Sequence, residues 1–531
     1  MKNKNTELLI ITSFLVCFLA ILLINTFHAP FYIDDEYNLI KVNRPNELFG
    51  SSDNFIQDFI GFQKGFFDYG RFFPLLSSIV FLRGKLAGTS PFAQHVIVFL
   101  FGIASALVIY LIAKKLNFSK TISFICSITF LTGHEFGEIF MRLQSGESPG
   151  LLFVLISILF VLKYKDSRNK TDLYISFLCG IFAGLCKESF IILLPLIPIL
   201  LIMESTPLLL PEKITRERNS FYLFYGAFIF LTLLLLLVIK TSNKVFDYGE
   251  PLSLPDLLLN NFIWIFKWFV PFMPFVLIAL VDIIRKKKFN QILILCLFSV
   301  AWISSQLLMY YKIIISFSQG RYLIPAALIF IFLLGLSLNY IEKNYKKIFL
   351  ISLFLIGLIT LRNAKIIYIN SNEFAARANA YDNLIDEMVH QKPQKIAVYG
   401  GFEFFQSIST FFKWHSYQPQ LITTPIVPAL NQKKKQYDNS AFENSLQEKL
   451  KLDFVYKTLS DLKTDTSVNY LITSAYEEWE ELNYSEISKS FPHHKKVTAY
   501  FSNASFSDIL RKDFWTGNLK NDKRTLVIFY K

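Results

Sequence analysis

The chain has 531 residues and a formal net charge of +13, and 53% of its residues are hydrophobic, including 56 phenylalanines. A mean hydropathy of +0.40 excludes an ordinary water-soluble protein, which could not bury so much apolar side-chain area. The basic residues lie in short clusters between apolar runs, which is typical of membrane topology and excludes a nucleic-acid-binding surface.

The apolar runs predict a polytopic α-helical membrane protein with about eleven transmembrane helices. The first run is too long for a signal peptide and lacks a small-residue cleavage site, so we expect it to remain as a span. Two short runs meet at Cys186-Lys187-Glu188, and basic loops on both sides require them to form a hairpin. The predicted spans lie near residues 8–27, 91–112, 119–133, 149–164, 172–186, 188–203, 221–239, 261–280, 290–310, 321–339 and 348–361.

Lysine and arginine cluster in every second short connection, which marks the cytoplasmic side by the positive-inside rule. This predicts a cytoplasmic N-terminus and an outer location for everything after Leu361. By the same parity Lys187 and Arg321 face outwards, as does the acidic triplet Asp34-Asp35-Glu36.

The outer connection 32–90 contains two semi-apolar stretches, FIQDFIGF and RFFPLLSSIVFLRGKLAG, which predict helices lying in the membrane interface. After Leu361 the sequence becomes polar, with an amphipathic helix predicted from Phe374 to His390 and strands at 395–401, 469–476 and 525–531. We therefore expect a membrane module at 1–361 and an extracytoplasmic soluble α/β domain at 362–531. No cysteine follows Cys296, so this domain has no disulfide, which fits a bacterial cytoplasmic (inner) membrane protein.

Three groups of ionisable residues could carry chemistry on the outer side. The carboxylates of Asp34, Asp35 and Glu36 could deprotonate a hydroxyl acceptor, or could simply be a solvated acidic loop. Lys187 and Glu188 lie between two apolar runs, where charges usually face a cavity, although the two could also pair with each other.

Arg321 opens the span that begins GRYLIPA, where a guanidinium either extends to the lipid headgroups or binds a phosphate with two hydrogen bonds. For the remaining polar residues an interfacial or solvated role is favoured; they are Arg71, Arg142, Glu147, His134 and Glu135. His493 and His494 are predicted to lie in a solvated turn.

These motifs in this order resemble the GT-C class of membrane glycosyltransferases: Asp35-Glu36 after the first span, CKESFIILLPL in a short hairpin, and RYLIPA at a later span. The closest resemblance is to the protein O-mannosyltransferase and aminoarabinose transferase branch, whose sugar donors are polyprenyl phosphates. The resemblance covers about residues 1–360. Its motifs are short, and their order along the chain is the stronger part.

The resemblance implies that Asp35 is the general base, with Glu36 beside it. The family pattern needs only two acids, so the choice between Asp34 and Asp35 stays open. Lys187 and Arg321 would bind the lipid phosphate, and Arg71 and Arg142 are further phosphate-binding candidates. No cofactor is required in this branch, and no metal is predicted, although the acidic triplet could bind a divalent cation.

The expected function is transfer of a sugar from a polyprenyl-phosphate-linked donor to an extracytoplasmic acceptor, either an envelope glycan, a lipid or a protein. A single displacement assisted by one base would invert the anomeric centre of a hexosyl or pentosyl group. A transporter or flippase of lipid-linked sugars is a second interpretation, although the internal repeats common in such folds are not found. A non-catalytic envelope assembly protein is a third.

Overall fold

The computed structural model describes residues 2–27, 54–68, 72–88, 90–133, 139–143, 146–202, 217–241, 270–285, 324–400, 419–425, 454–456, 459–476, 487–489, 491–501 and 523–531, with single residues between them. Two compact units make up the chain. The first contains Met1–Leu23, Gln63–Val80 and His95–Tyr368, and the second contains Ile24–Phe62, Phe81–Gln94 and Ile369–Lys531.

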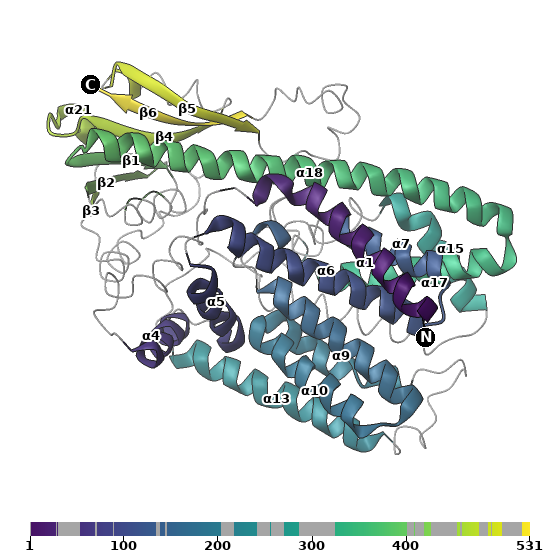
Figure 1. The fold of residues 1–531 in the computed structure, drawn as a ribbon. Coiled ribbons are helices and arrows are strands. Elements are labelled where there is room, and N and C mark those ends of the chain that lie inside the picture. Colours follow the sequence, from purple (N-terminus) through teal and green to yellow (C-terminus); the bar gives the residue numbers. More distant parts are fainter. Residues whose placement is uncertain are drawn as a thin grey trace. The chain divides into compact units, whose positions relative to one another are not determined.

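The first unit is helical (Figure 1). Its helices are α1 (Lys2–Leu23), α6 (Pro91–Lys115), α7 (Lys120–Leu131), α9 (Glu147–Ser167), α10 (Lys170–Cys186), η2 (Glu188–Leu196), α11 (Ile199–Ile202), α13 (Arg218–Thr241), η3 (Val270–Phe272), α15 (Met273–Arg285), α17 (Ile324–Asn344) and the start of α18 (Lys346–Gln391). A short 3₁₀ turn, η1 (Ile24–Thr26), follows α1.

Hydroxyl groups connect neighbouring helices of this unit through backbone carbonyls. Ser157 of α9 donates to the Ser176 carbonyl of α10, and Ser176 donates in return to the Ser157 carbonyl, each at 2.7 Å. The Ser127 hydroxyl of α7 donates to the Ala106 carbonyl of α6 at 2.8 Å. Such hydrogen bonds, added to close packing, are how helices associate where no water competes for polar groups.

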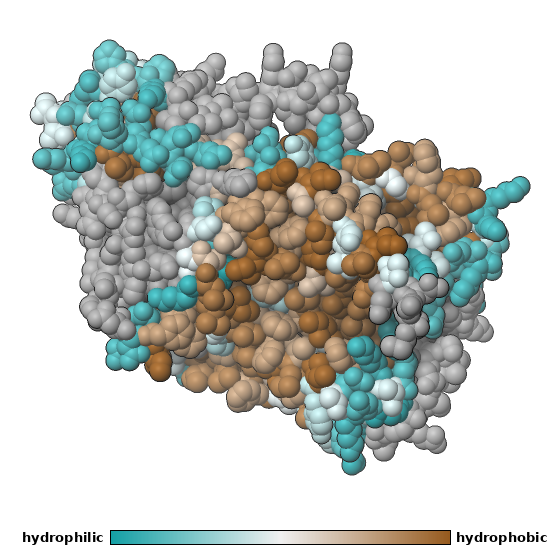
Figure 2. All heavy atoms as spheres, viewed as in Figure 1, coloured by the Kyte–Doolittle hydropathy of each residue, from teal (hydrophilic) through white to brown (hydrophobic). Residues whose placement is uncertain are grey.

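Six helices in the described part of the chain are long and apolar enough to cross a membrane. They include α1, α6, α9, α13, α17 and α18, and they agree with six of the predicted spans. Their outer faces carry exposed large apolar side chains such as Leu9, Ile229 and Leu233, which suits contact with lipid. On the face shown in Figure 2, hydrophobic residues cover these helices broadly, and hydrophilic residues gather where α9 turns into α10.

The predicted spans 119–133 and 172–186 are helices α7 and α10, and span 261–280 corresponds in part to η3 and α15. The segment 188–203 differs from a regular span because it forms the 3₁₀ helix η2 and the single-turn helix α11. Pro195 and Pro198 explain the difference, since proline lacks the amide hydrogen that a continuous α-helix needs. The predicted span 290–310 lies outside the described residues.

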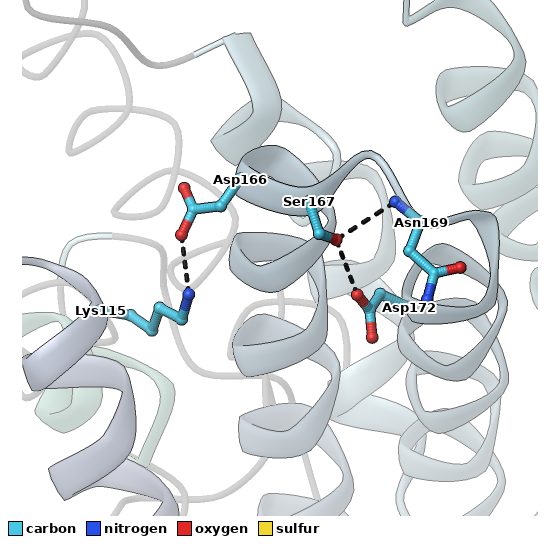
Figure 3. Close-up of polar contacts among 5 residues, drawn as sticks. All are labelled: Lys115, Asp166, Ser167, Asn169 and Asp172. Carbon is cyan, nitrogen blue, oxygen red and sulfur yellow. Dashed lines mark hydrogen bonds and ion pairs between the residues drawn. The ribbon is translucent and has the colours of Figure 1, made fainter.

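A polar turn joins α9 to α10 (Figure 3). Arg168 ends α9 in the left-handed conformation, with φ of 58°, and the Asn169 side chain caps α10 by accepting from the Thr171 amide. The Ser167 hydroxyl donates to Asp172 at 2.9 Å and accepts from the Asn169 amide at 3.2 Å. This turn lies on the predicted cytoplasmic side.

The outer connection contains two helices, α4 (Phe55–Asp68) and α5 (Pro74–Ala87), so the predicted helices are confirmed there. In the second unit the rings of Phe55, Phe59 and Phe62 contact Phe81. Their location in the membrane interface stays a prediction.

The second unit contains a mixed sheet of six described strands in the order β3-β2-β1-β4-β6-β5. Strands β1, β2, β3 and β4 are parallel, and β6 is antiparallel to both of its neighbours. The strands are β1 (Lys395–Gly400), β2 (Gln420–Pro425), β3 (Phe454–Tyr456), β4 (Tyr470–Tyr476), β5 (His493–Phe501) and β6 (Lys523–Tyr530).

Hydrophobic clusters cover both faces of this sheet. On one face, Leu384, Ile385 and Met388 of α18 pack with Ile396 and Val398 of β1. On the other face, a separate cluster includes Ala397 and Tyr399 of β1, Leu462 of the short helix α21 (Leu459–Thr464), and Phe491. Residues of β1 therefore alternate between the two faces, and the predicted C-terminal α/β fold is confirmed.

Helix α18 differs from the prediction of a short span at 348–361 and a separate amphipathic helix at 374–390. It is one helix of 46 residues (Figure 1), roughly 69 Å long at 1.5 Å per residue. The stretch between the two predicted segments contains no glycine or proline, so the change in polarity does not interrupt the helix. The domain division at residue 361 stays a prediction, because α18 passes through that position.

The prediction that His493 and His494 lie in a turn is wrong, although both are exposed to solvent as expected. Both residues begin strand β5, where His493 stacks on Tyr530 and His494 contacts Phe529. Alternating side chains of an edge strand pair with those of its neighbour, which the short motif did not indicate.

Candidate active site

Lys187 lies at the break between α10 and η2. Its backbone is extended, with φ of −155° and ψ of 126°, so the α-helix ends at Cys186 and the chain turns into the 3₁₀ helix. The Lys187 ammonium is 3.5 Å from the Glu147 carboxylate and 5.3 Å from the centre of the Phe73 ring. The side chains are only 12% and 6% exposed for the lysine and the glutamate respectively.

Two glycines at the start of α9 bring Glu147 to this lysine. A Cβ atom on Gly146 would lie 2.7 Å from the Cys186 carbonyl oxygen, and a Cβ atom on Gly150 would lie 2.6 Å from the Phe190 ring. Only hydrogen fits in either place, so the first turn of α9 approaches the end of α10 without an intervening side chain. Glu147, directly after Gly146, then faces Lys187.

Two glycines of α10 hold η2 in the same way. A Cβ atom on Gly180 would lie 2.8 Å from Leu194, and one on Gly184 would lie 3.0 Å from Ile191. In each pair the glycines are four residues apart. Gly146 faces Cys186, directly before Lys187, whereas Gly150, Gly180 and Gly184 face residues of η2. The turn at Lys187 is therefore fixed from α9 and from α10.

The charges of this site are almost removed from water. Glu147 is 4% exposed and Glu188, the first residue of η2, is 3% exposed. Glu147 lies in the first turn of α9, where the helix dipole favours a negative charge. A lysine ammonium has three donors, so it can bind a carboxylate and a phosphate oxygen at the same time.

One of the two interpretations of Lys187 was that it pairs with Glu188; the ion-pair partner found in the structure is Glu147. Glu147 was expected to be an interfacial or solvated residue, and its burial shows that this expectation is wrong. The signal that could have found it is the repeated Gly-x-x-x-Gly spacing at 146–150 and 180–184, which predicts close helix contact.

Arg142 is half-buried and lies five residues before Glu147, after the helical residues 139–141. It is therefore close to Glu147 in the sequence, and it belongs to the same unit as Glu147 and Lys187. The remaining predicted site residues lie outside the described residues; these are Asp34, Asp35, Glu36, Arg71 and Arg321, together with His134 and Glu135.

Within the described ranges no three His, Cys, Asp or Glu side chains form a group that could hold a metal ion. Four cysteines in those ranges, Cys17, Cys126, Cys179 and Cys186, are free thiols.

Residues 74–245 match the family model described as dolichyl-phosphate-mannose-protein mannosyltransferase. This region contains Arg142, Glu147 and Lys187. No curated protein sequence matches the chain.

Among solved structures the chain is similar to the crystal structure of ArnT from Cupriavidus metallidurans bound to undecaprenyl phosphate. The TM-score is 0.51 and the sequence identity is 11%, over 97% of this chain and 98% of ArnT. At this low sequence identity, the similarity shows a shared fold and nothing more. The predicted fold class, a GT-C-like helical membrane protein with a C-terminal sheet domain, is confirmed, and so is the predicted resemblance to the mannosyltransferase and aminoarabinose transferase branch.

Proposed function

We propose that this protein is an integral membrane glycosyltransferase that moves a sugar from a polyprenyl-phosphate carrier to an acceptor outside the cytoplasm. The observation that carries the proposal is the buried Lys187 turn, which lies within the region that matches the mannosyltransferase family model. The similarity to an ArnT structure that holds undecaprenyl phosphate supports a donor of the same chemical class.

The donor has an apolar tail, an anionic phosphodiester and an electrophilic anomeric carbon. The acceptor hydroxyl oxygen forms a bond to that carbon while the bond from the carbon to the phosphate oxygen breaks, and its electron pair leaves with the phosphate. The acceptor proton goes to Asp35 or to Asp34. The lipid phosphate changes from one negative charge to two, so a fixed Lys187 ammonium stabilises the transition state more than the donor.

Arg321 assists this stabilisation from the outer end of its span, and Arg142 and Arg71 complete the cationic surroundings. One displacement with one base inverts the anomeric configuration of a hexosyl or pentosyl group. The proposed reaction requires no cofactor. The enzyme lies in the bacterial inner membrane, with its N-terminus in the cytoplasm and the domain 362–531 outside.

The test compares the envelope glycans and glycoproteins of cells that carry Asp35→Asn, Lys187→Gln, wild type or a full deletion, with membrane protein levels measured in each. Both variants should accumulate normally and lose the same sugar as the deletion. Asp166→Asn, which removes a carboxylate at the opposite end of α9, is the matched control and should keep the normal profile. A normal profile in Asp35→Asn and Asp34→Asn alike would contradict the proposed base, and a normal profile in Lys187→Gln would contradict the phosphate site.

The proposed topology is tested separately by a reporter fused after Leu361. An extracytoplasmic reporter supports an outer C-terminal domain, whereas a cytoplasmic one would contradict both the parity of the spans and the outer site.

A further inference from the structure

We propose that Glu147 is a positioning residue that lowers the affinity of the site for the spent lipid phosphate, by neutralising Lys187 and repelling the second negative charge of the product. This inference rests on the proposed function, since it concerns how the same lysine treats the donor and the product. The carboxylate acts through Lys187 and contributes no bond to the reacting sugar.

The Glu147 carboxylate lies beside the lysine that would bind the phosphate. The Glu147 carboxylate is 3.5 Å from the Lys187 ammonium, and the Phe73 ring faces the same ammonium at 5.3 Å. Because Gly146 and Gly150 fix the start of α9 against Cys186 and Phe190, the backbone that carries Glu147 cannot move away without disturbing this packing. Any phosphate bound by Lys187 therefore also lies near a fixed negative charge.

The donor lipid and the product lipid differ in the charge of their phosphate. A polyprenyl-phosphate sugar is a phosphodiester and carries one negative charge. Loss of the sugar leaves a phosphate monoester whose second ionisation occurs near pH 6, so the product carries close to two negative charges at neutral pH. A lone buried lysine would hold the product more tightly than the donor, and product would then inhibit the enzyme.

The effect of the Glu147 charge on the affinity for the product follows from Coulomb's law. One additional charge about 8 Å from the carboxylate changes the affinity by roughly 2-fold at the dielectric constant of water and roughly 30-fold at an effective value of 20. The burial of both side chains favours the upper part of this range. The same carboxylate opposes the charge that grows in the transition state. It therefore lowers the rate of the chemical step and raises the rate at which the product is released.

The experiment measures the inhibition constant of undecaprenyl phosphate and the donor KM for the purified full-length protein and Glu147→Gln. We expect both constants to fall in the variant, and the ratio of the inhibition constant to the donor KM to fall by about 3- to 30-fold, because the product carries one more charge than the donor. Single-turnover transfer should be faster, because the carboxylate no longer opposes the charge that grows in the transition state. Glu147→Asp keeps the charge and should keep the wild-type ratio of the two constants, and Asp166→Asn, at the exposed Lys115 pair, is the matched control and should also keep it.

An unchanged ratio in Glu147→Gln would overturn the inference, as would a variant that has lost single-turnover transfer but binds both lipids as wild type does. The second outcome would make Glu147 a catalytic base. If the variant does not fold, the wild type still tests the idea, because it should bind undecaprenyl phosphate no more tightly than undecaprenyl methyl phosphate. A monoester that binds the wild type more than tenfold tighter would refute the inference. Absence of any transferase activity in wild type would instead contradict the proposed function and leave these binding measurements valid.

Discussion

Replacing Gly150 by alanine should destabilise the protein, although alanine is the better helix former. A Cβ atom at this position would lie 2.6 Å and 2.7 Å from two atoms of the Phe190 ring and 3.3 Å from the Cys186 Cβ. Phe190 is 1% exposed, so its ring is enclosed by other parts of the protein. Overpacking of this kind costs about 1–3 kcal/mol. The gain in helix propensity is about 1 kcal/mol, so the net loss should be about 0–2 kcal/mol.

The assay is thermal unfolding of the purified protein in one detergent, with sugar transfer measured on the folded fraction. Gly226→Ala in α13 and Gly357→Ala in α18 are matched controls, because nothing lies within 4 Å of a Cβ atom at either position. Both controls should be neutral or stabilising. If Gly150→Ala were as stable as these controls, the close contact between α9 and η2 would not hold the Lys187 turn.

Two further predictions concern contacts between helices. Ser157→Ala and Ser176→Ala should each lower the free energy of unfolding by about 0.5–1.5 kcal/mol. The double variant should lose less than the sum, because the two hydrogen bonds are reciprocal. Strict additivity in a double-mutant cycle would contradict this prediction. Arg168→Ala should lower the stability by about 1–3 kcal/mol, because Arg168 pairs with the buried Glu217 while its guanidinium is 41% exposed. Burial alone would lower the pKa of Arg168, but the hydrogen bond and charge of Glu217 outweigh it and raise the pKa. A raised pKa gives stability that is present below the ordinary value, so unfolding measured from pH 7 to pH 10 should show no loss from this pair.

The helices could be predicted from the sequence because long apolar runs have few alternatives in a membrane. The sequence prediction divides α18 into a span and a separate amphipathic helix, because the composition changes from apolar to polar within it. A change in polarity does not break the backbone hydrogen bonds of a helix, and the stretch between the two predicted segments contains no proline or glycine. Strands β2, β3 and β5 were missed as well, since a strand of three residues such as β3 gains its definition from its neighbours in the sheet.

The turn at Lys187 was predicted correctly because two short apolar runs meet at an ionisable pair. Its partner Glu147 could not be derived from that motif, because forty residues separate the two and their contact depends on glycines in both helices. The position of a charged residue between two apolar runs identifies Lys187, whereas the Gly-x-x-x-Gly spacing identifies α9 as the helix that approaches it.

Helix α9 carries an ion pair near each end, and burial distinguishes their roles. Lys115 and Asp166, 2.8 Å apart and with side chains 37% and 61% exposed, form a surface pair worth about 0–1 kcal/mol (Figure 3). Glu147 and Lys187 are buried, and replacing a buried pair by neutral side chains of similar volume is often neutral or stabilising. The double variant Glu147→Gln/Lys187→Met should therefore unfold at the wild-type temperature or above it, yet transfer no sugar. A destabilised double variant would mean that the pair serves the fold, whereas a stable and inactive one would mean that the protein keeps two costly buried charges for its chemistry.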